Sequence, residues 1–274
     1  MVEEKLIERR RNHLAEVEPT ASSNAGLWLD KYLCGENQRA KSRKGKTVKA
    51  QLVEEAAAII EIPLYRDFFD QWKKALTINE TKLAKAKVEG RLAIGLGDDG
   101  VLETSITLHH TYGVPYIRGS ALKGLAAAFA RNRIGGRWKA EGYRSGKWEE
   151  VSQAYKIVFG ETDDAGYVIF HDALYVPGSG AKGKALHADI ITVHHSKYYS
   201  DAKENVVPPA DWDEPIPVPF LSATGSYLIA LSAPNGCEDW RDAAFDILRL
   251  ALAEEGIGAK TSSGYGRMKL EANK

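Results

Sequence analysis

Hydrophobic positions in the first 80 residues recur at helical spacing, whereas several later stretches of the chain alternate with a period of two. The first pattern predicts a mostly helical region and the second predicts strands. Pro63 is placed to end one helix or to begin the next. The expected helices cover residues 1–17, 24–33, 48–60 and 65–76. Asn24 suits a cap for the second helix, whose apolar face consists of Leu27, Trp28 and Leu33.

Beyond residue 81, alternation predicts strands over residues 82–96, 101–110, 167–176, 187–195, 226–233 and a closing stretch over 264–271. One helix is expected over residues 121–131, with Ser120 as its cap, and another over residues 238–255. The apolar stripe of the second consists of Trp240, Ala244, Ile247, Leu248 and Ala251. One helix thus follows the early strands and one precedes the last strand. This order predicts an α+β fold of ferredoxin-like or RRM-like type with long insertions.

We expect residues 1–80 to form a helical N-terminal region and residues 81–274 an RRM-like domain, together making one structural unit. Residues 134–165 are rich in glycine, arginine and lysine, which predicts an insertion. Residues 196–220 contain five prolines, which predicts a long ordered loop or a clamp. Trp212 and Phe220 offer apolar anchors, so segment 207–220 is expected to pack on the domain or on a neighbouring subunit.

Lysine and arginine total 37, as do aspartate and glutamate, so the net charge is zero. A protein that binds nucleic acid through its overall charge is usually basic, so such binding would depend on local clusters. The main cluster consists of Arg39, Lys41, Arg43, Lys44, Lys46 and Lys49, with no acid between them. It suits either a solvated loop or phosphate contact. We expect residues 35–49 to become ordered only against RNA or another subunit.

Other features narrow the class of protein. No apolar run reaches the roughly 18 residues that span a bilayer, and the N-terminus lacks the apolar core of a secretory signal. Cys34 and Cys237 lie far apart, which indicates neither a disulfide framework nor a zinc site. We therefore expect a cytoplasmic protein with no metal, no other cofactor and no membrane partner.

The segment GIGAKTSSGYG, residues 256–266, combines glycines with one lysine and three hydroxyls. It does not match the phosphate loop of nucleotide hydrolases, because Ala259 precedes Lys260 and the preceding element is a helix. A structural turn needs one glycine, so the others favour close approach of a nucleic-acid backbone, with a purely structural turn as the alternative. The candidate RNA-binding residues here are Gly256, Gly258, Lys260, Thr261, Ser262, Ser263, Gly264, Tyr265 and Gly266. Lys260 and the hydroxyls would contact phosphate, and Tyr265 would contact a base.

Two segments resemble hallmarks of the RAMP superfamily, the RRM-like subunits of CRISPR effector complexes. One is this glycine-rich stretch, and the other is GVPYIRGSALKGLAAAFA, residues 113–130. Segments 24–33, 101–113 and 189–221 further resemble the sixth-subunit family of type III-B (Cmr) complexes. The likeness runs from about residue 22 to the end of the chain. Arg118 stands where the superfamily usually has proline, which loosens the turn and adds a charge.

The resemblance implies a subunit at the end of a protein filament built along a guide RNA, which pairs with target RNA in antiviral defence. Such a subunit lies near the 3′ end of the guide. The implied protein partners are the repeated RAMP backbone subunit, the small helical subunit and the other end-capping RAMP subunit. Gly119, Ser120 and Lys123 are expected to add to the RNA contact.

A ribonuclease is the alternative to a binding subunit. Some RAMP relatives cut RNA with histidine as general acid or base, which makes His109 or His110 a candidate. Repeated backbone subunits carry an aspartate that supports target cleavage, and the comparable position here is Glu103. Glutamate is longer by a methylene, and a small shift of a catalytic group costs about 10²-fold in rate. We therefore expect a non-catalytic subunit, with Glu103 and His110 as the residues to test.

Overall fold

An antiparallel sheet forms the centre of the molecule in the computed structural model, which describes residues 17–20, 22–33, 47–79, 81–134, 138, 153–193, 208, 210–212 and 214–271. Its strands follow the order β2–β4–β7–β1–β8, and β3 also pairs with β7. The strands are β1 (Lys82–Val88), β2 (Tyr116–Ile117), β3 (Ile169–Phe170), β4 (Ala173–Tyr175), β7 (Ser226–Ser232) and β8 (Met268–Leu270). On β1, Ala84 and Ala86 are buried while Lys85 and Lys87 are exposed, as alternation predicts.

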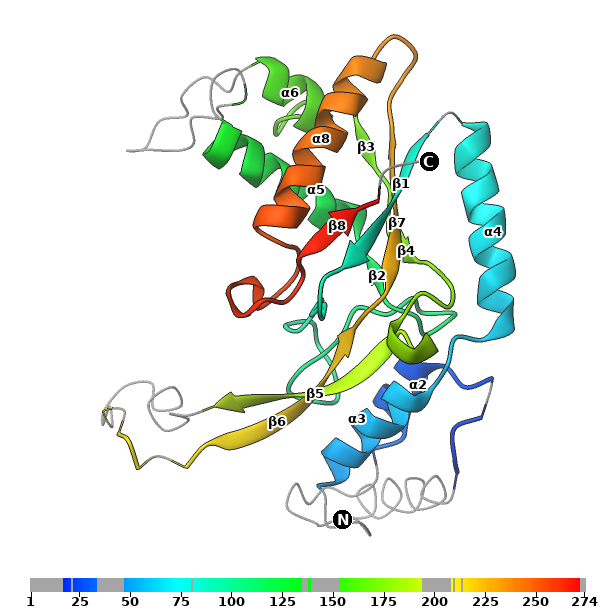
Figure 1. Cartoon of the computed structure of the whole chain (residues 1–274), viewed down its shortest axis with the longest axis vertical. Helices are drawn as coiled ribbons and strands as arrows, with labels where there is room; N and C mark the ends of the chain where they lie inside the picture. Colours follow the sequence, from blue (N-terminus) through cyan, green and yellow to red (C-terminus); the bar gives the residue numbers. More distant parts are fainter. Residues whose placement is uncertain are drawn as a thin grey trace.

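Two helices pack together on one face of this sheet, α5 (Gly119–Phe129) and α8 (Glu238–Glu254). The shorter α6 (Gln153–Phe159) lies beside them, and α4 (Pro63–Ile78) lies on the other side of the sheet (Figure 1). The predicted stripe of α8 is buried except for Trp240, which meets Trp138 edge to face with 6.3 Å between ring centroids. The order β1–α5–β4–β7–α8–β8 is that of a ferredoxin-like fold, so the predicted α+β class is confirmed.

Aromatic side chains hold α4 in place. Pro63 begins this helix at its first position. Tyr65 is fully buried and donates a hydrogen bond to the carbonyl of Tyr175 on β4. Close to it, Phe68 stacks on Tyr112 with 4.8 Å between ring centroids. The helix is therefore anchored both to β4 and to the loop that precedes β2.

A two-stranded hairpin, β5 (Leu186–Val193) paired with β6 (Ile216–Ala223), projects from the lower end of the sheet (Figure 1). Helix α3 (Val48–Ala58) packs on both of its strands, and α2 (Ala25–Lys31) packs on α3. Asn24 caps α2, as predicted, by accepting a hydrogen bond from the amide of Leu27 at 3.0 Å. Trp28 is buried but Leu27 is 53% exposed, so the prediction that Leu27 lies on the apolar face is wrong.

Alternation does not produce a strand over residues 101–110, which form an irregular loop with one isolated bridge between Leu108 and Pro115. Ile106 is buried and Leu102 and Leu108 pack against the core, so the alternation reflects a loop seated on the core. Strand β1 ends at Val88 rather than at residue 96, because Gly90 turns the chain with a φ of +95°. The strand predicted over residues 167–176 divides into β3 and β4.

The proline-rich segment also differs from the prediction. Residues 216–220 belong to β6 rather than to a loop, with Pro217 opposite Thr192 and Pro219 opposite Ile190. Because the two prolines are two residues apart, their nitrogens lie on the same edge of β6. This is the edge that faces away from β5, so the missing N–H groups break no hydrogen bond between the two strands. Phe220 is buried as an anchor, whereas Trp212 is 86% exposed and is not an anchor onto the described part of the domain.

Some predictions fall on residues that the structure does not describe. These are residues 1–16 of the first predicted helix and most of the insertion before α6. Within the described residues, no helix has the length and apolarity needed to cross a bilayer.

Candidate nucleic-acid interface

The glycine loop, Gly256–Gly266, connects α8 to β8 and lies against the extended segment that follows β1 (Figure 1). Two backbone hydrogen bonds fix it there. The amide of Ala259 donates to the carbonyl of Ala93 at 2.7 Å, and the amide of Gly266 donates to that of Arg91 at 2.8 Å. The residues between these two bonds form a projecting turn.

Two glycines of this loop are required by the chain's own backbone. A Cβ atom on Gly258 would lie 2.2 Å from the carbonyl oxygen of Ala93, and one on Gly266 would lie 1.9 Å from that of Ile257. Their φ angles are also positive, +90° and +74°. Gly264 differs, because it is exposed and nothing lies within 4 Å of its Cβ position. The clustering of glycines therefore has a packing cause, and Gly264 is the position that leaves room for a ligand.

The projecting turn presents free hydrogen-bond donors. Lys260 has a left-handed backbone with a φ of +59° and precedes a single 3₁₀ turn, Thr261–Ser263. The amides of Lys260, Thr261 and Ser262 donate to no acceptor among the residues that the structure describes. Ser262 is exposed, and Lys260 and Thr261 are half-exposed. Consecutive free amides beside a left-handed residue form a concave donor surface that suits phosphate.

Tyr265 joins the glycine loop to the hairpin. Its hydroxyl donates to Oδ2 of Asp189 on β5 at 2.7 Å, and its ring centroid lies 6.2 Å from that of Phe220 on β6. Burial raises the pKa of Tyr265 to about 12, and the bond to Asp189 acts in the same direction. The ring is half-buried, so the base contact expected of Tyr265 would use only its exposed side.

The segment before α5 uses its residues differently from the expectation. Gly119 is buried as the first residue of the helix, and its amide donates to Oδ1 of Asp172 at 2.7 Å. A Cβ atom there would lie 2.0 Å from the carbonyl oxygen of Phe170. Ser120 is exposed and does not cap the helix, because Asp172 supplies the acceptor. The amide of Gly119 is thus occupied within the chain, while Ser120 and the half-exposed Lys123 remain accessible.

Arg118 is paired within the chain. Its Nη2 atom lies 2.8 Å from Oδ2 of Asp98, in the turn that follows the extended segment after β1. The Asp98 carboxylate also accepts a hydrogen bond of 3.4 Å from the hydroxyl of Thr107. The charge that Arg118 adds is therefore balanced by a carboxylate, and the pair links the start of α5 to this turn.

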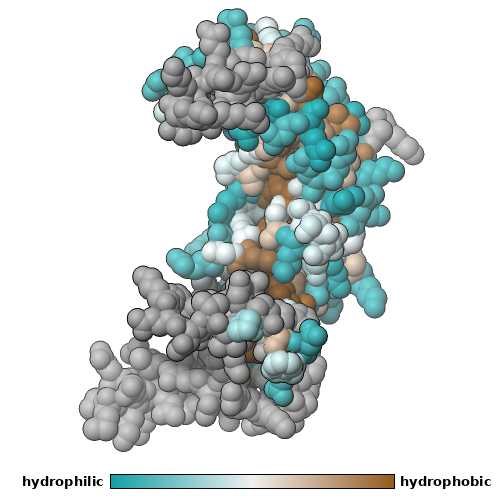
Figure 2. Space-filling view, turned by 90° about the vertical axis from the view of Figure 1, so that its left-hand side faces the viewer, coloured by the Kyte–Doolittle hydropathy of each residue, from teal (hydrophilic) through white to brown (hydrophobic). Residues whose placement is uncertain are grey.

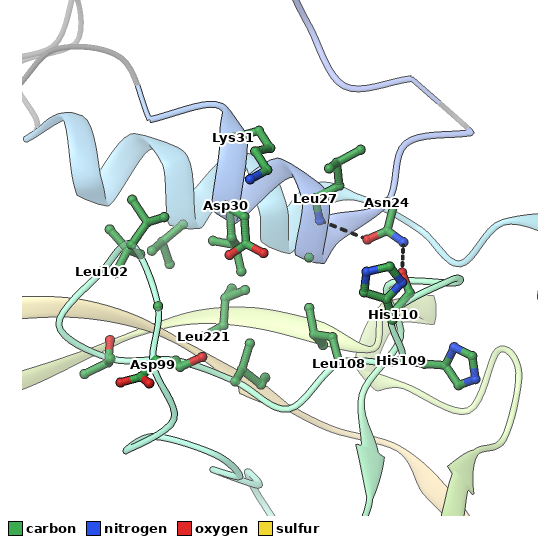
Figure 3. A pocket seen from close by; sticks show the side chains of 18 residues that line it. Asn24, Leu27, Asp30, Lys31, Asp99, Leu102, Leu108, His109, His110 and Leu221 are labelled. Atoms are coloured by element: carbon green, nitrogen blue, oxygen red, sulfur yellow. Dashed lines mark hydrogen bonds between the residues drawn. The ribbon is translucent and has the colours of Figure 1, made fainter. Parts of the chain in front are cut away.

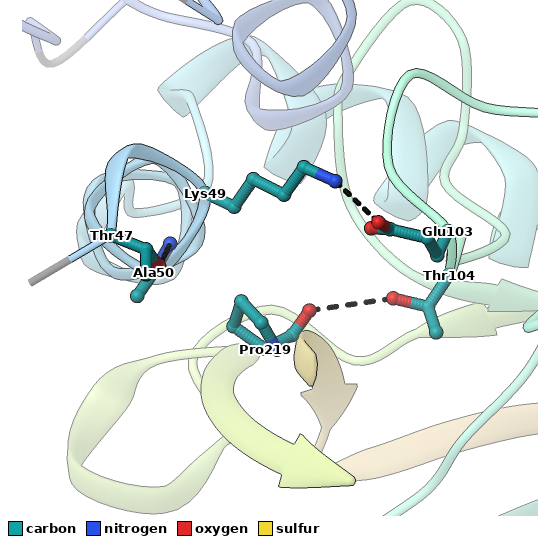
Figure 4. A network of polar contacts seen from close by, with 6 residues as sticks. All are labelled: Thr47, Lys49, Ala50, Glu103, Thr104 and Pro219. Atoms are coloured by element: carbon teal, nitrogen blue, oxygen red, sulfur yellow. Dashed lines mark hydrogen bonds and ion pairs between the residues drawn. The ribbon is translucent and has the colours of Figure 1, made fainter. Parts of the chain in front are cut away.

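Glu103 is ion-paired with Lys49 of α3 (Figure 4). The hydrogen bond from Lys49 is the main cause of the lowered pKa of Glu103, and it outweighs the opposite effect of burial. The neighbouring Thr104 hydroxyl donates to the carbonyl of Pro219 on β6 at 3.4 Å. A carboxylate with a lowered pKa is a weaker general base. Glu103 therefore helps hold this loop between α3 and the hairpin.

His110 and Asn24 lie at one end of a cavity of about 440 Å³, and Leu102 lies at the other end (Figure 3). The amide of the Asn24 side chain donates to the carbonyl of His110 at 2.9 Å, and the His110 side chain is exposed. His109 packs instead against Tyr112, with 4.8 Å between ring centroids, and burial lowers its pKa. Within the described residues, no three His, Cys, Asp or Glu side chains are arranged to hold a metal ion.

Both the glycine loop and the segment before α5 lie in a region that matches a known family. The RAMP superfamily matches residues 85–269. A CRISPR system Cmr subunit Cmr6 from Pyrococcus furiosus is 31% identical over 246 residues, covering 75% of this chain and 72% of that protein. The chain belongs to the RAMP superfamily and, within it, to the Cmr6 family. The resemblance to the sixth-subunit family is therefore confirmed.

Solved structures are similar to this Cmr6-family chain. A chain of the cryo-EM structure of the Type III-B Cmr-beta bound to cognate target RNA aligns with a TM-score of 0.61 and 18% identity. That alignment covers 97% of this chain and 88% of the other, which shows a shared fold. The crystal structure of Cmr6 from Pyrococcus furiosus aligns with a TM-score of 0.43 and 31% identity, over 70% of this chain and 98% of the other.

The basic segment of this Cmr6-family member is only partly described. Arg39, Lys41, Arg43, Lys44 and Lys46 lie outside the described residues. The end of the segment is folded, since Thr47 caps α3 and Lys49 is ion-paired. For residues 47–49, the expectation of order only against RNA or another subunit is therefore wrong.

Arg91 is a cation of the Cmr6-family chain that the sequence patterns do not single out. Its guanidinium donates to Oγ of Ser222 on β6 at 3.1 Å, and its carbonyl holds Gly266 of the glycine loop. It therefore lies where the loop meets the root of the hairpin. In the sequence it follows Lys82, Lys85 and Lys87 of a predicted strand, and no pattern there indicates contact with the glycine loop or the hairpin.

Proposed function

We propose that this chain is a non-catalytic RNA-binding subunit of a type III-B CRISPR effector complex. It holds the 3′ region of the guide RNA, so that the guide pairs with target RNA in antiviral defence. Membership in the Cmr6 family supports the place in the complex. The observation that carries the RNA contact is the turn Lys260–Ser263, where free amides, hydroxyls and a lysine lie together at the surface.

This turn suits a backbone contact rather than a base contact. Amides, hydroxyls and lysine bind phosphate oxygens without reading sequence, and a subunit that holds many different guides needs such contacts. The open space beside Gly264 leaves room for a strand to approach the amides. A net charge of zero is compatible with this role, because only one face would meet RNA while others meet protein.

We also propose that the chain does not cleave RNA. The Glu103 carboxylate is taken up by Lys49, and its lowered pKa weakens it as a base. The test is to incubate the purified chain with guide-like and target-like RNA, with and without magnesium. Product that forms with the wild type and disappears with Glu103→Gln or His110→Ala would show a ribonuclease and overturn this part of the proposal.

The proposed partners are the guide and target RNA, the repeated RAMP backbone subunit, the small helical subunit and the other end-capping RAMP subunit. The projecting hairpin supports contact with a neighbouring subunit, because Trp212 beside β6 is 86% exposed. Large exposed aromatic side chains are enriched where one protein meets another. Co-purification of the tagged chain from its source would identify the RNA and proteins that it carries.

The decisive test of the RNA contact is the variant Lys260→Gln, measured in the assembled complex across a salt series. Loss of one phosphate contact should weaken binding equally for all guide sequences and reduce the salt slope by about 0.7–1 unit. Lys74→Gln on α4 is the matched control, because Lys74 is exposed on the other side of the sheet. Wild-type affinity and slope in Lys260→Gln would mean that Lys260 is not the phosphate contact.

A further inference from the structure

A second loop repeats the arrangement found at Lys260. The tripeptide Gly-Ala-Lys occurs at residues 258–260 and again at residues 180–182. Lys182 and Lys260 are the two residues other than glycine with a positive φ in the described part of the chain, +56° and +59°. Each lysine belongs to a single 3₁₀ turn, although its place differs: Lys182 lies within the turn Ala181–Gly183, whereas Lys260 directly precedes the turn Thr261–Ser263. Left-handed residues other than glycine are costly and persist mainly where function requires them.

The two loops also share their backbone constraints. A Cβ atom on Gly180 would lie 2.0 Å from the carbonyl oxygen of Lys184, just as one on Gly258 would meet a carbonyl oxygen. After each lysine comes a glycine with positive φ and open space at its Cβ position, Gly183 in this loop and Gly264 in the other. The amide of Lys182 donates to no acceptor among the described residues. We call residues 180–184 the GAK loop.

Two buried hydroxyls hold the GAK loop and Arg91 close to each other. Thr224, which is 5% exposed, accepts a hydrogen bond from the amide of Ala181 at 3.0 Å and donates to the carbonyl of Lys184 at 3.2 Å. Ser222, which is fully buried two residues earlier, accepts the hydrogen bond from Arg91. Ser222 lies near the end of β6 and Thr224 directly follows that strand, so the GAK loop and Arg91 are both held at the root of the hairpin.

This face is cationic. His187 lies opposite Ser222 in the β5–β6 register, and its Nε2 lies 3.2 Å from the Thr224 hydroxyl. Burial lowers the pKa of His187, and the positive charges of Arg91, Lys184 and Lys182 lower it further. Two carboxylates also lie nearby and keep their charges, since their hydrogen bonds come from neutral donors, so the three cations Arg91, Lys182 and Lys184 exceed them by one. Asp189 accepts from Tyr265, and Glu61 accepts from the amide of Gly178 at 2.7 Å.

We propose that the GAK loop is a second phosphate-binding loop, in which Lys182 and Lys184 contact the backbone of the same RNA that the glycine loop holds. The inference rests on the proposed RNA-binding function. Arg91 lies between the two loops and adds a cation along the path. The ligand is the sugar–phosphate backbone of single-stranded RNA, and the contact does not depend on sequence.

The test compares Lys182→Gln/Lys184→Gln with wild type in the full chain, using a labelled single-stranded RNA across a salt series. Each lost phosphate contact on a single strand lowers the salt slope by about 0.7, so the double variant should lose about 1.4. The control is Lys73→Gln/Lys74→Gln on α4, which makes the same change of charge on exposed lysines. Lys182→Gly is a second variant, which should weaken RNA binding without lowering the unfolding temperature, because glycine adopts this φ freely.

Three other outcomes separate the claims. If wild type and Lys260→Gln both fail to bind RNA, the proposed function fails and this inference fails with it. If Lys260→Gln lowers the slope but the Lys182/Lys184 variant matches the control, only the GAK loop proposal is overturned. If that variant binds RNA normally but no longer joins the assembled complex, the loop contacts protein instead of RNA.

Discussion

Lys49 and Glu103 show how one ion pair changes the chemistry of a carboxylate. Glu103 comes from the loop before β2 and Lys49 from the first turn of α3. The side chain of Glu103 is 51% exposed, so the pair adds only about 0–1 kcal/mol to the free energy of unfolding. The same hydrogen bond lowers the pKa of Glu103, because it favours the charged carboxylate.

We predict that Lys49→Met raises the pKa of Glu103 towards its ordinary value. The shift is measurable by NMR titration of the side-chain carboxyl carbons. The sign follows from linkage, since a lowered pKa contributes stability above the unfolded value that is lost as pH falls through the folded one. The variant should therefore lose stability above pH of about 4.3 and little below it. Lys74→Met serves as the control, and an unchanged Glu103 titration in Lys49→Met would contradict the prediction.

Gly258 and Gly264 should respond differently to alanine. Gly258→Ala places a methyl group against the Ala93 carbonyl oxygen in a left-handed conformation. We expect about 1–2 kcal/mol for the backbone and about 1–3 kcal/mol for the overlap. Gly264→Ala pays only the backbone term, because its Cβ position is open. Urea denaturation of both variants measures the difference, and equal losses would show that the loop can relax around Gly258.

Residue identities alone could not separate these glycines. The sequence predicts a phosphate-binding loop, but it does not distinguish the glycines required by packing from the glycine beside open space. Contact with residues 91–94, about 165 positions away in the sequence, distinguishes them and is invisible to local patterns. Lys260 and the hydroxyls can be named from the sequence because their chemistry is local, and their contact with phosphate stays a prediction. The position of Arg91 and the partner of Tyr265 depend on distant segments and could not be predicted.

At the scale of elements, local signals predicted helices better than strands. Asn24 and the apolar stripe of α8 give the position of their helices correctly, because caps and helical spacing act within a few residues. Residues 101–110 alternate as a strand does but find no neighbouring strand to pair with along their length. Pairing is a long-range property, so alternation alone is ambiguous.

Helix α5 depends on a cap from outside its own sequence. Asp172, between β3 and β4, accepts the hydrogen bond of the Gly119 amide. We predict that Asp172→Ala lowers the free energy of unfolding by about 1–3 kcal/mol, because a buried donor loses a charged acceptor. Chemical denaturation checks this value, with Asp163→Ala in an exposed turn as the control. A loss no greater than that of the control would mean that water replaces the carboxylate.

At the scale of the whole molecule, half-buried histidines couple stability to pH. His109, His171 and His187 come from three different segments, and burial lowers the pKa of each. The unfolded chain therefore binds protons near pH 6.5 before the folded chain does. The contribution of these histidines to the free energy of unfolding is therefore fully present above that pH and declines as pH falls below it.

We predict that the free energy of unfolding falls between pH 7 and pH 5. Urea denaturation across this range measures the slope. His171→Gln should reduce the slope, because it removes one of the three histidines with a lowered pKa. A slope that is flat in wild type would contradict the assignment of these histidines as neutral buried groups.

The overall topology could be predicted because the order of elements restricts a two-helix α+β chain to few arrangements. The hairpin of β5 and β6 could not be predicted, because prolines at alternate positions indicate a loop unless the register of β6 with β5 is known.

Those prolines have a consequence for the chain when it is separated from its partners. Exposed strand edges recruit further strands, and open-ended aggregation requires two such edges on each molecule. Pro217 and Pro219 remove two successive donors from the outer edge of β6, and the amide of Ala223 on that edge is bonded to Leu92, while the outer edge of β5 has no proline. An added strand can therefore lie beside β5 only, so growth by this route stops at a pair. Freshly synthesised chains awaiting RNA and the other subunits are protected from forming fibres through the hairpin.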